Sequence, residues 1–354
     1  MAAAAGFVHA GLQPGERVCL WAENRAEWIV ACLGLQAAGG VLVPLNTRFK
    51  QAEAAYIVER SAAVMAIASD EIPGARYAEM LEAIGAPGLR RVIRLGGADW
   101  AAFVSAPGAA AHAEAGRRVA ALSEHDLCDI MFTSGTTGNP KGAMATHGQT
   151  VRTARLWAKA TTIGEGDRFL ILWPFFHCSG YKAGWVVNLA VGATTLPEAS
   201  LDVAALLDKI EREQVTFLPG PPTLFQTLLA DPMLDRRRLA SLRVSITGAA
   251  SVAPTMIEAM RRDLGIPVVL TGYGLTETCG TVTMSSPDDP PEIVTNSCGR
   301  AIDGIELRLV DDDNRQVASG EPGEVAVRGM NVMLGYLDDP AATAEAIEDR
   351  KSVV

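Results

Sequence analysis

Short apolar runs alternate with longer, helix-like segments along the first third of the chain. The runs Arg17–Trp21 and Val41–Val43 have the length and composition of buried strands. The segments Asn24–Ala38 and Ala52–Arg60 have the pattern of helices that cover such strands. Because strands that alternate with helices form parallel sheets, this pattern predicts an α/β subdomain over residues 1–120.

A second alternation of strand-like and helix-like segments runs from Asp126 to about Val282, and it predicts another α/β subdomain over residues 121–298. Between the two, Gly85–Ala121 is rich in Ala and Gly and has weak periodicity, so we expect a surface connection there. The strand candidates of the second subdomain are Phe169–Leu172, Val215–Leu218, Val244–Thr247 and Val268–Thr271, and its helix candidates are Val203–Gln214 and Pro254–Asp263.

The pattern changes to strict alternation beyond Gly304. In Ile305–Val310 and Glu324–Arg328, apolar and polar side chains occupy every second position. This spacing is typical of an antiparallel, half-exposed β element, so residues 299–348 are expected to form part of a β-barrel. The predicted fold class is therefore α/β: two stacked parallel-sheet subdomains with a partial antiparallel β-barrel.

Composition excludes several kinds of partner and location. The 354 residues carry 31 basic and 41 acidic side chains, a net charge of −10, which argues against a broad surface for nucleic acid or for an anionic membrane. The most membrane-like stretch, Trp28–Leu45, contains a glycine pair and Pro44, so we expect a helix and a strand there and no transmembrane segment. Scattered cysteines without metal-ligand spacing predict free, buried thiols in a reducing, cytoplasmic compartment. They are Cys19, Cys32, Cys128, Cys178, Cys279 and Cys298.

A phosphate-binding composition follows the apolar run Asp129–Phe132. The segment Thr133–Gly142 contains four hydroxyl side chains, three glycines and one lysine. Glycines let backbone N–H groups approach an anion, hydroxyls donate hydrogen bonds, and Lys141 adds a positive charge. The spacing differs from a Walker loop, because Asn139 and Pro140 separate a glycine from the lysine. These residues favour a polyphosphate site, with an ordinary surface turn as the alternative.

A second candidate site follows the last strand candidate of the second subdomain. Gly272 and Gly274 flank Tyr273, and we expect them to leave room for its ring to stack on a flat heterocycle. Thr276 could donate to a phosphate or carboxylate oxygen, and Glu277 could bind a hard cation such as Mg²⁺. The alternative is a buried tyrosine beside a helix N-terminus that Thr276 caps.

Two further segments have both a functional and a structural interpretation. In Trp173–Trp185, His177 stands among aromatic and small residues. A lone histidine in such company is more often a core residue than a functional one. Ser245–Ala250 could be a turn at a ligand site or merely the end of a buried strand.

The loop within "FTSGTTGNPKG", Ser134–Gly142, resembles the signature loop of the AMP-forming acyl-CoA synthetases, whose superfamily also contains luciferases and peptide-synthetase adenylation domains. The resemblance runs from about Gly11 to Ala346. It implies a two-step reaction: a carboxylate attacks the α-phosphate of ATP to give an acyl-adenylate, and a thiol then displaces AMP. It also implies ATP and Mg²⁺ as cofactors, CoA as co-substrate and a hydrophobic carboxylic acid as substrate.

The resemblance assigns a role to each candidate residue. The loop and Lys141 hold the β and γ phosphates, Tyr273 stacks on adenine, Thr276 contacts the α-phosphate and Glu277 binds Mg²⁺, so Lys141, Thr276 and Glu277 are the implied catalytic residues. His177 lines the acid pocket without transferring a proton, because a carboxylate is already ionised at neutral pH. The implied nucleotide-binding residues are Thr133, Ser134, Gly135, Thr136, Thr137, Gly138, Lys141, Gly248, Ala249, Ala250, Gly272, Tyr273, Gly274 and Thr276. The implied acid-binding residues are His177, Tyr181, Gly184 and Trp185.

A more detailed resemblance concerns the identity of the acid substrate. The strings "PFFHCSGYKAGW", "LPGPPTLFQTLL" and "LTGYGLTE" look most like actinobacterial ligases that attach CoA to a steroid-derived methylindanedione propanoate. Small residues such as Gly180, Ala183 and Gly184 suit a bulky bicyclic acid. Medium or long fatty acids fit the same residues.

The sequence departs from the family pattern at both ends. Beyond Ala346 the family continues with an Arg/Thr-Gly-Asp motif, a hinge and a small C-terminal domain that carries a catalytic lysine, and its opening segment is also longer. We therefore expect a fragment that forms acyl-adenylate poorly and no thioester. Residues 349–354 match the translation of a common sequencing adapter and are expected to be an artefactual tail. The alternatives to a CoA ligase are a module that loads a carrier protein and a catalytically incompetent fragment that binds ATP or acyl groups.

Overall fold

The computed structural model describes residues 1–69, 75–133, 139–232, 234–248, 252–347 and 352–353. Its contacts divide the chain into two compact units. The limits of the subdomains expected from the sequence stay predictions. Unit 1 comprises Met1–Thr150, Phe175–His177 and Met333–Ala344, and unit 2 comprises Val151–Pro174, Cys178–Val332 and Glu345–Val354.

Unit 1 is built on a seven-stranded sheet in the order β16-β6-β5-β2-β1-β3-β4. Neighbouring strands from β5 to β4 run parallel, whereas β6 runs antiparallel to both of its neighbours. The central strands are buried along almost their whole length, as expected of a sheet covered on both faces. The strands are β1 (Arg17–Trp21), β2 (Val41–Pro44), β3 (Met65–Ala68), β4 (Arg91–Arg94), β5 (Leu127–Thr133), β6 (Lys141–Thr146) and β16 (Gly335–Tyr336).

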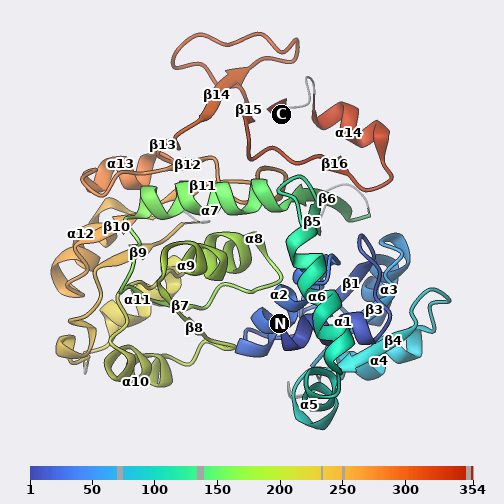
Figure 1. The fold of residues 1–354 in the computed structure, drawn as a ribbon. Helices are drawn as coiled ribbons and strands as arrows, with labels where there is room; N and C mark the ends of the chain where they lie inside the picture. Colours follow the sequence, from blue (N-terminus) through green and yellow to red (C-terminus); the bar gives the residue numbers. More distant parts are fainter. Residues whose placement is uncertain (70–74, 134–138, 233, 249–251, 348–351, 354) are drawn as a thin grey trace. The chain divides into compact units, whose positions relative to one another are not determined.

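Helices cover both faces of this sheet (Figure 1). The connections β1–α2–β2 and β2–α3–β3 cross the sheet in opposite directions, and because parallel crossovers are right-handed, α2 and α3 lie on opposite faces. On the α3 face, Ile57 and Leu81 pack with Trp21 in one hydrophobic cluster. On the other side, α1 packs against α2, α5 and α6. The helices are α1 (Ala2–His9), α2 (Ala26–Ala37), α3 (Gln51–Arg60), α4 (Tyr77–Ile84), α5 (Gly97–Ser105), α6 (Ala109–Ala121) and α14 (Pro340–Ala346).

The expectation of a surface connection over Gly85–Ala121 was wrong. This segment supplies the edge strand β4, which pairs in parallel with β3, and the helices α5 and α6. The helix α5 buries Trp100 and Phe103, whose rings stack with centroids 5.6 Å apart. The helix α6 is rich in alanine and buries Ala115, so its conformation follows from high helix propensity and leaves little hydrophobic periodicity to detect.

The strands β5 and β6 also belong to the first sheet, although their sequence pattern placed them with the second subdomain. β5 joins β2 in parallel through the pairing of Leu42 with Asp129. It then forms an antiparallel hairpin with β6. The loop rich in Ser, Thr and Gly is therefore carried by unit 1.

Unit 2 contains a second parallel arrangement of strands. β8 pairs with β7, β10 pairs with β9, and Phe217 bridges β7 and β9 through parallel pairings with Phe169 and Val244. The strand predicted at Val215–Leu218 is present as this bridge. The strands are β7 (Arg168–Ile171), β8 (Thr194–Pro197), β9 (Val244–Ile246) and β10 (Val268–Leu270).

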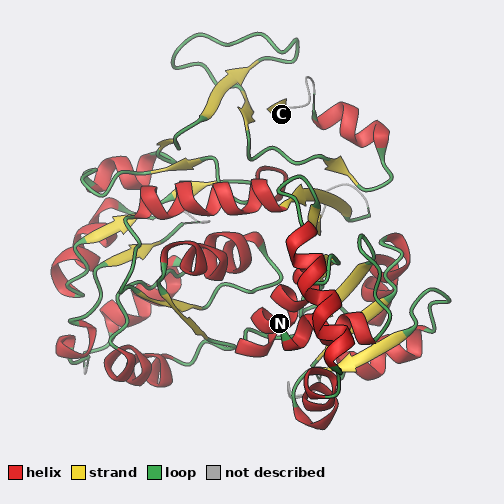
Figure 2. Ribbon diagram, viewed as in Figure 1, coloured by secondary structure: helices red, strands yellow, loops and turns green. Residues whose placement is uncertain are grey.

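Helices surround these strands of unit 2 (Figure 2). Buried apolar side chains pack between the helices and the strands. The rings of Phe169 and Phe217 lie 4.5 Å apart, and Trp157 lies 5.7 Å from Phe217. The helices predicted over Val203–Gln214 and Pro254–Asp263 are confirmed as α10 and α12. The helices are α7 (His147–Thr161), α9 (Val186–Val191), α10 (Val203–Glu213), α11 (Pro222–Ala230), α12 (Pro254–Asp263) and α13 (Pro291–Asn296).

The last part of unit 2 is antiparallel, as the alternating pattern predicted. β14 (Ile305–Val310) and β15 (Glu324–Gly329) pair over six residues each. Another small sheet joins β11 (Gly272–Tyr273), β12 (Thr283–Met284) and β13 (Arg300–Ala301). No closed barrel forms within the described ranges. The predicted fold class, α/β with parallel sheets and an antiparallel element, is confirmed.

Candidate functional site

The hairpin β5–β6 brings the two ends of the Ser/Thr/Gly loop together. Thr133 ends β5 and pairs with Lys141, the first residue of β6. The Thr133 hydroxyl donates to the carbonyl oxygen of Lys141 at 3.4 Å. Strand pairing therefore fixes a hydroxyl and an ammonium at the base of the loop. The other loop residues assigned from the sequence lie outside the described residues: Ser134, Gly135, Thr136, Thr137 and Gly138.

Lys141 is exposed at the start of β6, and its ammonium lies 5.2 Å from the centroid of the Tyr336 ring. An ammonium at this distance from an aromatic face is attracted by the ring quadrupole. Tyr336 is held near Lys141 because β16 pairs with β6, where Tyr336 lies opposite Ala143. Sequence reasoning missed this tyrosine, since the pairing of residues so far apart leaves no local signal.

Three segments that the sequence assigned to function follow the carboxyl ends of neighbouring parallel strands of unit 2. Trp173–Trp185 follows β7, Gly248 follows β9, and Tyr273 follows β10. Parallel strands end at one edge of their sheet, which is where ligands bind in open α/β sheets. This edge therefore gathers the predicted adenine, α-phosphate and acid groups of unit 2. Ala249 and Ala250 lie outside the described residues.

The glycines around Tyr273 lie against other backbone segments. A Cβ at Gly274 would lie 2.2 Å from the carbonyl oxygen of Gly280, and one at Gly272 would lie 2.7 Å from that of Thr283. They therefore allow backbone segments to approach each other closely. Tyr273 itself is half-buried, and burial raises the pKa of its hydroxyl, with smaller contributions from Cys298 and Glu277.

Thr276 does not cap the short helix that it begins. The cap position is Leu275, whose N–H donates to the Thr278 hydroxyl at 3.0 Å. Thr276 instead hydrogen-bonds the thiol of Cys178. The capping alternative weighed from the sequence is wrong, because the hydroxyl two residues further on meets that backbone N–H.

Cys178 connects the acid-side segment with the Thr276–Glu277 segment. Burial raises the pKa of its thiol to about 11; the charge of Lys182 and the hydrogen bond with Thr276 act in the opposite direction, and the charge of Glu277 raises it further. A Cβ at Gly280 would lie 3.0 Å from the Cys178 sulfur, so the two segments are in close contact. A neutral thiol here packs like a small apolar group.

Asn331 is a buried residue of this site that sequence reasoning did not find. It is 0% exposed, and its side-chain amide donates to the carbonyl oxygens of Thr281 at 2.7 Å and Thr278 at 3.3 Å. Between those carbonyls the backbone turns through Cys279 and Gly280, both in the left-handed region with φ of 54° and 87°. Asn331 thus holds the turn that follows Thr276 and Glu277.

The acid-side segment contains a π-helical turn over Tyr181–Trp185. All five residues are buried, and the rings of Tyr181 and Trp185 lie 5.1 Å apart. Gly184 has φ −113° and ψ −108°, a break in helical geometry, and a Cβ there would lie 3.0 Å from the Ser179 carbonyl oxygen. Such turns are rare and concentrate at functional sites.

His177 belongs to unit 1 together with Phe175 and Phe176. The Phe175 N–H donates to the side-chain carbonyl of Asn24 at 2.8 Å, which fixes this short segment on the first unit. The His177 ring reaches solvent, yet the surrounding protein desolvates it partly and lowers its pKa. Burial therefore favours the neutral form of the imidazole.

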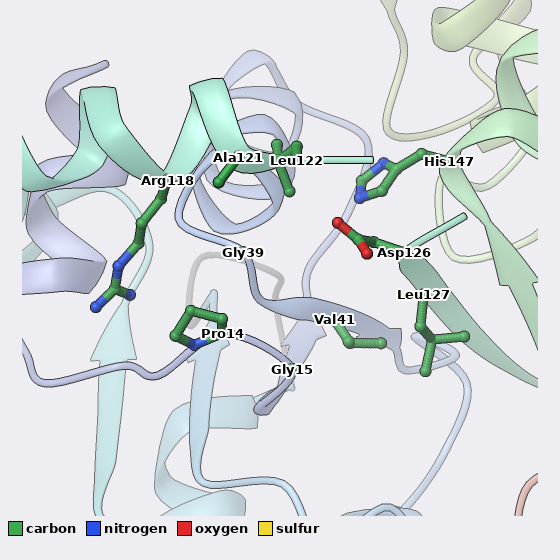
Figure 3. Close-up of a pocket in the computed structure, with 10 residues that line it drawn as sticks. All are labelled: Pro14, Gly15, Gly39, Val41, Arg118, Ala121, Leu122, Asp126, Leu127 and His147. Atoms are coloured by element: carbon green, nitrogen blue, oxygen red, sulfur yellow. The ribbon is translucent and has the colours of Figure 1, made fainter. Parts of the chain in front are cut away.

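Unit 1 also contains a cavity of about 280 Å³ that belongs to none of the predicted segments (Figure 3). Gly15 precedes β1, Val41 begins β2 and Leu127 begins β5, so the cavity lies at the amino ends of these strands. The His147 ring faces the Asp126 carboxylate; burial lowers the His147 pKa, against the charges of Asp129 and Asp126. The loop at the carboxyl end of β5 is on the opposite edge.

The described residues contain no group of three or more His, Cys, Asp or Glu side chains arranged to hold a metal ion. A helix of the length and apolar character needed to cross a membrane is likewise not found in the described part of the chain.

Comparison with known proteins identifies the family of this chain. The AMP-binding enzyme family matches residues 1–337. A 3-[(3aS,4S,7aS)-7a-methyl-1,5-dioxo-octahydro-1H-inden-4-yl]propanoyl:CoA ligase of Mycobacterium tuberculosis is 43% identical over 98% of this chain and 67% of its own length. The ligase of the same description from Rhodococcus jostii is 41% identical over the same shares.

Solved structures of similar fold include enzymes of the same kind. A fatty acyl CoA synthetase of Mycobacterium tuberculosis has a TM-score of 0.85 at 26% identity, covering 99% of this chain and 67% of its own. An ATP-bound chimera, RpMatB-BxBclM B3, has a TM-score of 0.81 at 26% identity, covering 100% of this chain and 69% of its own. The chain thus spans about two thirds of the length of these proteins. It belongs to the AMP-binding enzyme family, among the AMP-forming acid:CoA ligases.

Proposed function

We propose that this chain carries the nucleotide and acid sites of a ligase that activates a fused-ring, oxo-substituted propanoate with ATP and transfers the acyl group to CoA. In the first step a carboxylate oxygen attacks the α-phosphorus, the bond to the β-phosphate oxygen breaks, and pyrophosphate leaves with the electron pair. In the second step the thiolate of CoA attacks the acyl carbon, and AMP leaves. The observation that carries the proposal is the common edge of the second sheet, from which the segments after β7, β9 and β10 all extend.

The proposal assigns separate residues to the phosphates and to the reacting centre. Lys141 and the hydroxyls of the loop hold the β and γ phosphates, supported by the placement of Thr133 and Lys141 at its base. Tyr273 stacks on adenine beside Gly248, and Thr276 contacts the α-phosphate. The loop residues of this assignment are Ser134, Gly135, Thr136, Thr137 and Gly138, the adenine turn adds Ala249 and Ala250, and the acid-side residues are His177, Tyr181, Gly184 and Trp185.

A single carboxylate at the proposed Mg²⁺ position fits what this ion requires. Glu277 is half-buried and offers oxygen ligands. Mg²⁺ keeps several waters and is commonly bound by one or two carboxylates with substrate phosphates, so a cluster of protein ligands is not needed. When bound, the ion would neutralise charge on the phosphates; Glu277 orients it, and Thr276 donates to the phosphate oxygen.

The acid is proposed from the relatives together with the buried, irregular turn Tyr181–Trp185. Two relatives above 40% identity are named for a dioxo-octahydroindenyl propanoyl substrate. The second candidate is a medium or long fatty acid, favoured by the likeness to the fatty acyl CoA synthetase structure. We place the reaction in the cytoplasm, a reducing compartment, because the cysteines are free thiols, five buried and Cys298 exposed.

Calorimetry on this chain tests the nucleotide assignment. ATP should bind wild type with Mg²⁺ present, and Lys141→Met should weaken ATP about tenfold or more while leaving AMP nearly unchanged, because a charge about 4 Å from a phosphate oxygen interacts by roughly 4 kcal/mol at a dielectric near 20. Lys159→Met is the control, since Lys159 is an exposed lysine of unit 2. Equal losses for ATP and AMP would contradict the β,γ-phosphate role.

Non-hydrolysable acyl-adenylate analogues test the acid. A sulfamoyl adenosine that carries the fused-ring acyl group should bind more tightly than AMP and more tightly than the octanoyl analogue. An adenylate analogue that binds no better than AMP would argue against a joined site for nucleotide and acid. Assays with CoA and with a phosphopantetheinylated carrier protein as acyl acceptors separate a CoA ligase from a carrier-loading module.

A further inference from the structure

Lys182 is a charged side chain inside unit 2 that the proposed reaction does not use. It is 2% exposed and lies in the middle of the π-helical turn Tyr181–Trp185. Lysine is almost never buried this completely unless it is paired, because its ammonium is strongly hydrated in water.

The ammonium lies beside the segment that is assigned to the reacting centre. Its nitrogen is 3.7 Å from the Cys279 sulfur and 5.9 Å from the centroid of the Tyr181 ring. Cys279 comes directly after the short helix that contains Thr276 and Glu277. Lys182 also acts electrostatically on Cys178, whose thiol is hydrogen-bonded to Thr276. The charge is therefore close to the threonine that is proposed to contact the α-phosphate.

The acids named for the two relatives carry a matching acceptor. Each has a ketone on the ring carbon next to the one that bears the propanoyl chain, so this oxygen is only a few bonds from the carboxylate. A lysine ammonium donates up to three hydrogen bonds and accepts none, and a ketone oxygen accepts and does not donate. A ketone near the reacting carboxylate and an ammonium near Thr276 are complementary in position and in chemistry.

We propose that Lys182 donates a hydrogen bond from its ammonium to the ring ketone next to the propanoyl chain and thereby selects oxo acids over their deoxygenated counterparts. This inference rests on the proposed function, since it places the acid at the Thr276 segment. It assigns specificity to a side chain that neither touches the phosphates nor takes part in bond breaking. Sites that hydrogen-bond a substrate group reject analogues that lack it far better than hydrophobic pockets reject a missing methylene.

Two sulfamoyl adenosine analogues that differ only in this ketone test the proposal, with AMP as the third ligand. Wild type should bind the oxo analogue about tenfold or more tightly than the deoxo analogue, as a charge-assisted hydrogen bond allows. Lys182→Met should lose this preference by weakening the oxo analogue, with AMP affinity unchanged. Lys159→Met, which removes an exposed lysine from the same unit, should keep it.

Each of the other possible results would contradict either the role of Lys182 or the proposed function. Wild type that binds the oxo and deoxo analogues equally overturns the role of Lys182 while leaving the proposed function in place. Lys182→Met that weakens both analogues and AMP to the same extent assigns the lysine a structural role instead and also overturns it. An oxo analogue that binds wild type no better than AMP defeats the proposed function itself. If Lys182→Met does not fold, as judged by thermal melting, Lys182→Gln and the wild-type comparison decide the question.

Discussion

The hydroxyl of Tyr56 donates a hydrogen bond to the carbonyl oxygen of Pro140, 3.2 Å away. Tyr56 lies on α3, and Pro140 is the last residue before β6 and Lys141. A helix of unit 1 therefore holds the residue that precedes Lys141 through one side chain. If Lys141 binds phosphate as proposed, holding its neighbour in place lowers the conformational entropy that is lost on binding.

Tyr56→Phe should weaken ATP binding by a few-fold with little change in thermal stability, because it removes one hydrogen bond with a net value of about 1 kcal/mol. Calorimetric titration of ATP measures the effect. Tyr77→Phe is the matched control: its hydroxyl donates to the Thr47 carbonyl oxygen at 2.7 Å, and this bond does not involve the segment that precedes β6. Equal ATP affinities of Tyr56→Phe and wild type would show that this contact does not order the loop.

Asn331→Ala should destabilise unit 2 and weaken the acyl-adenylate analogue. The substitution leaves the carbonyl oxygens of Thr278 and Thr281 without the amide that now meets them, and a buried unsatisfied polar group costs about 1–3 kcal/mol. Urea unfolding gives the free energy, and titration at a temperature where both proteins are folded gives the affinity. Asn296→Ala, at an exposed helix end, is the control. A stable Asn331→Ala protein with unchanged affinity would remove Asn331 from the site.

Gly274→Ala should destabilise the chain by roughly 1–3 kcal/mol, since the added methyl group would overlap the Gly280 carbonyl and force the two backbone segments apart. Adenylate binding should fall with it, because Thr276 and Glu277 lie between these segments. Gly116→Ala offers a contrast: nothing lies within 4 Å of its Cβ position in α6, and alanine should stabilise the helix by about 0.5–1 kcal/mol. Similar stability changes for the two variants would refute the close-approach explanation.

Asp167 should make the stability of unit 2 dependent on acid pH. Burial tends to raise its pKa, but hydrogen bonds from Arg243, Thr216 and the Gly164 N–H outweigh burial and hold the pKa below its ordinary value of 3.8. A carboxylate whose pKa is lower in the folded state stabilises the fold above its unfolded pKa. That contribution is lost as the pH falls through the folded-state pKa.

The free energy of unfolding of wild type should therefore decrease as the pH drops below about 4, and the decrease should be smaller in Asp167→Asn. Near neutral pH, Asp167→Asn should be less stable than wild type. Asp167 comes directly before β7, and its partners Thr216 and Arg243 come directly before Phe217 and β9, so their contacts connect the amino ends of these strands. Asp208→Asn removes an exposed ion pair with Arg238 and should change stability by less than about 1 kcal/mol. Parallel pH profiles for Asp167→Asn and wild type would contradict the assignment.

The elements that were predictable from sequence are those whose burial leaves a regular pattern. β1, α2, β2, α10 and α12 each bury a continuous run or one helix face, so their apolar spacing locates them within a few residues. β4, α5 and α6 were missed because an edge strand of four residues and an alanine-rich helix carry little periodicity.

The residues of the candidate site also differ in whether the sequence could reveal them. Local motifs identified Lys141, Thr276 and Glu277, because hydroxyl, glycine and charged residues cluster within a few positions. Asn331 and Tyr336 are placed by contacts with backbone that is far away in the sequence. Nothing in the sequence around a single asparagine or tyrosine indicates such a contact. The purpose of Gly274 also required coordinates, since the carbonyl that excludes a side chain comes from another part of the turn.

Although each candidate segment of the second sheet follows its own strand, Cys178 and Lys182 tie the segment after β7 to the segment after β10. The strands β9 and β10 keep their alignment through their own pairing and through Phe217. We therefore expect a substitution in the turn Tyr181–Trp185 to be felt at Thr276 as well, so that changes on the two sides are coupled.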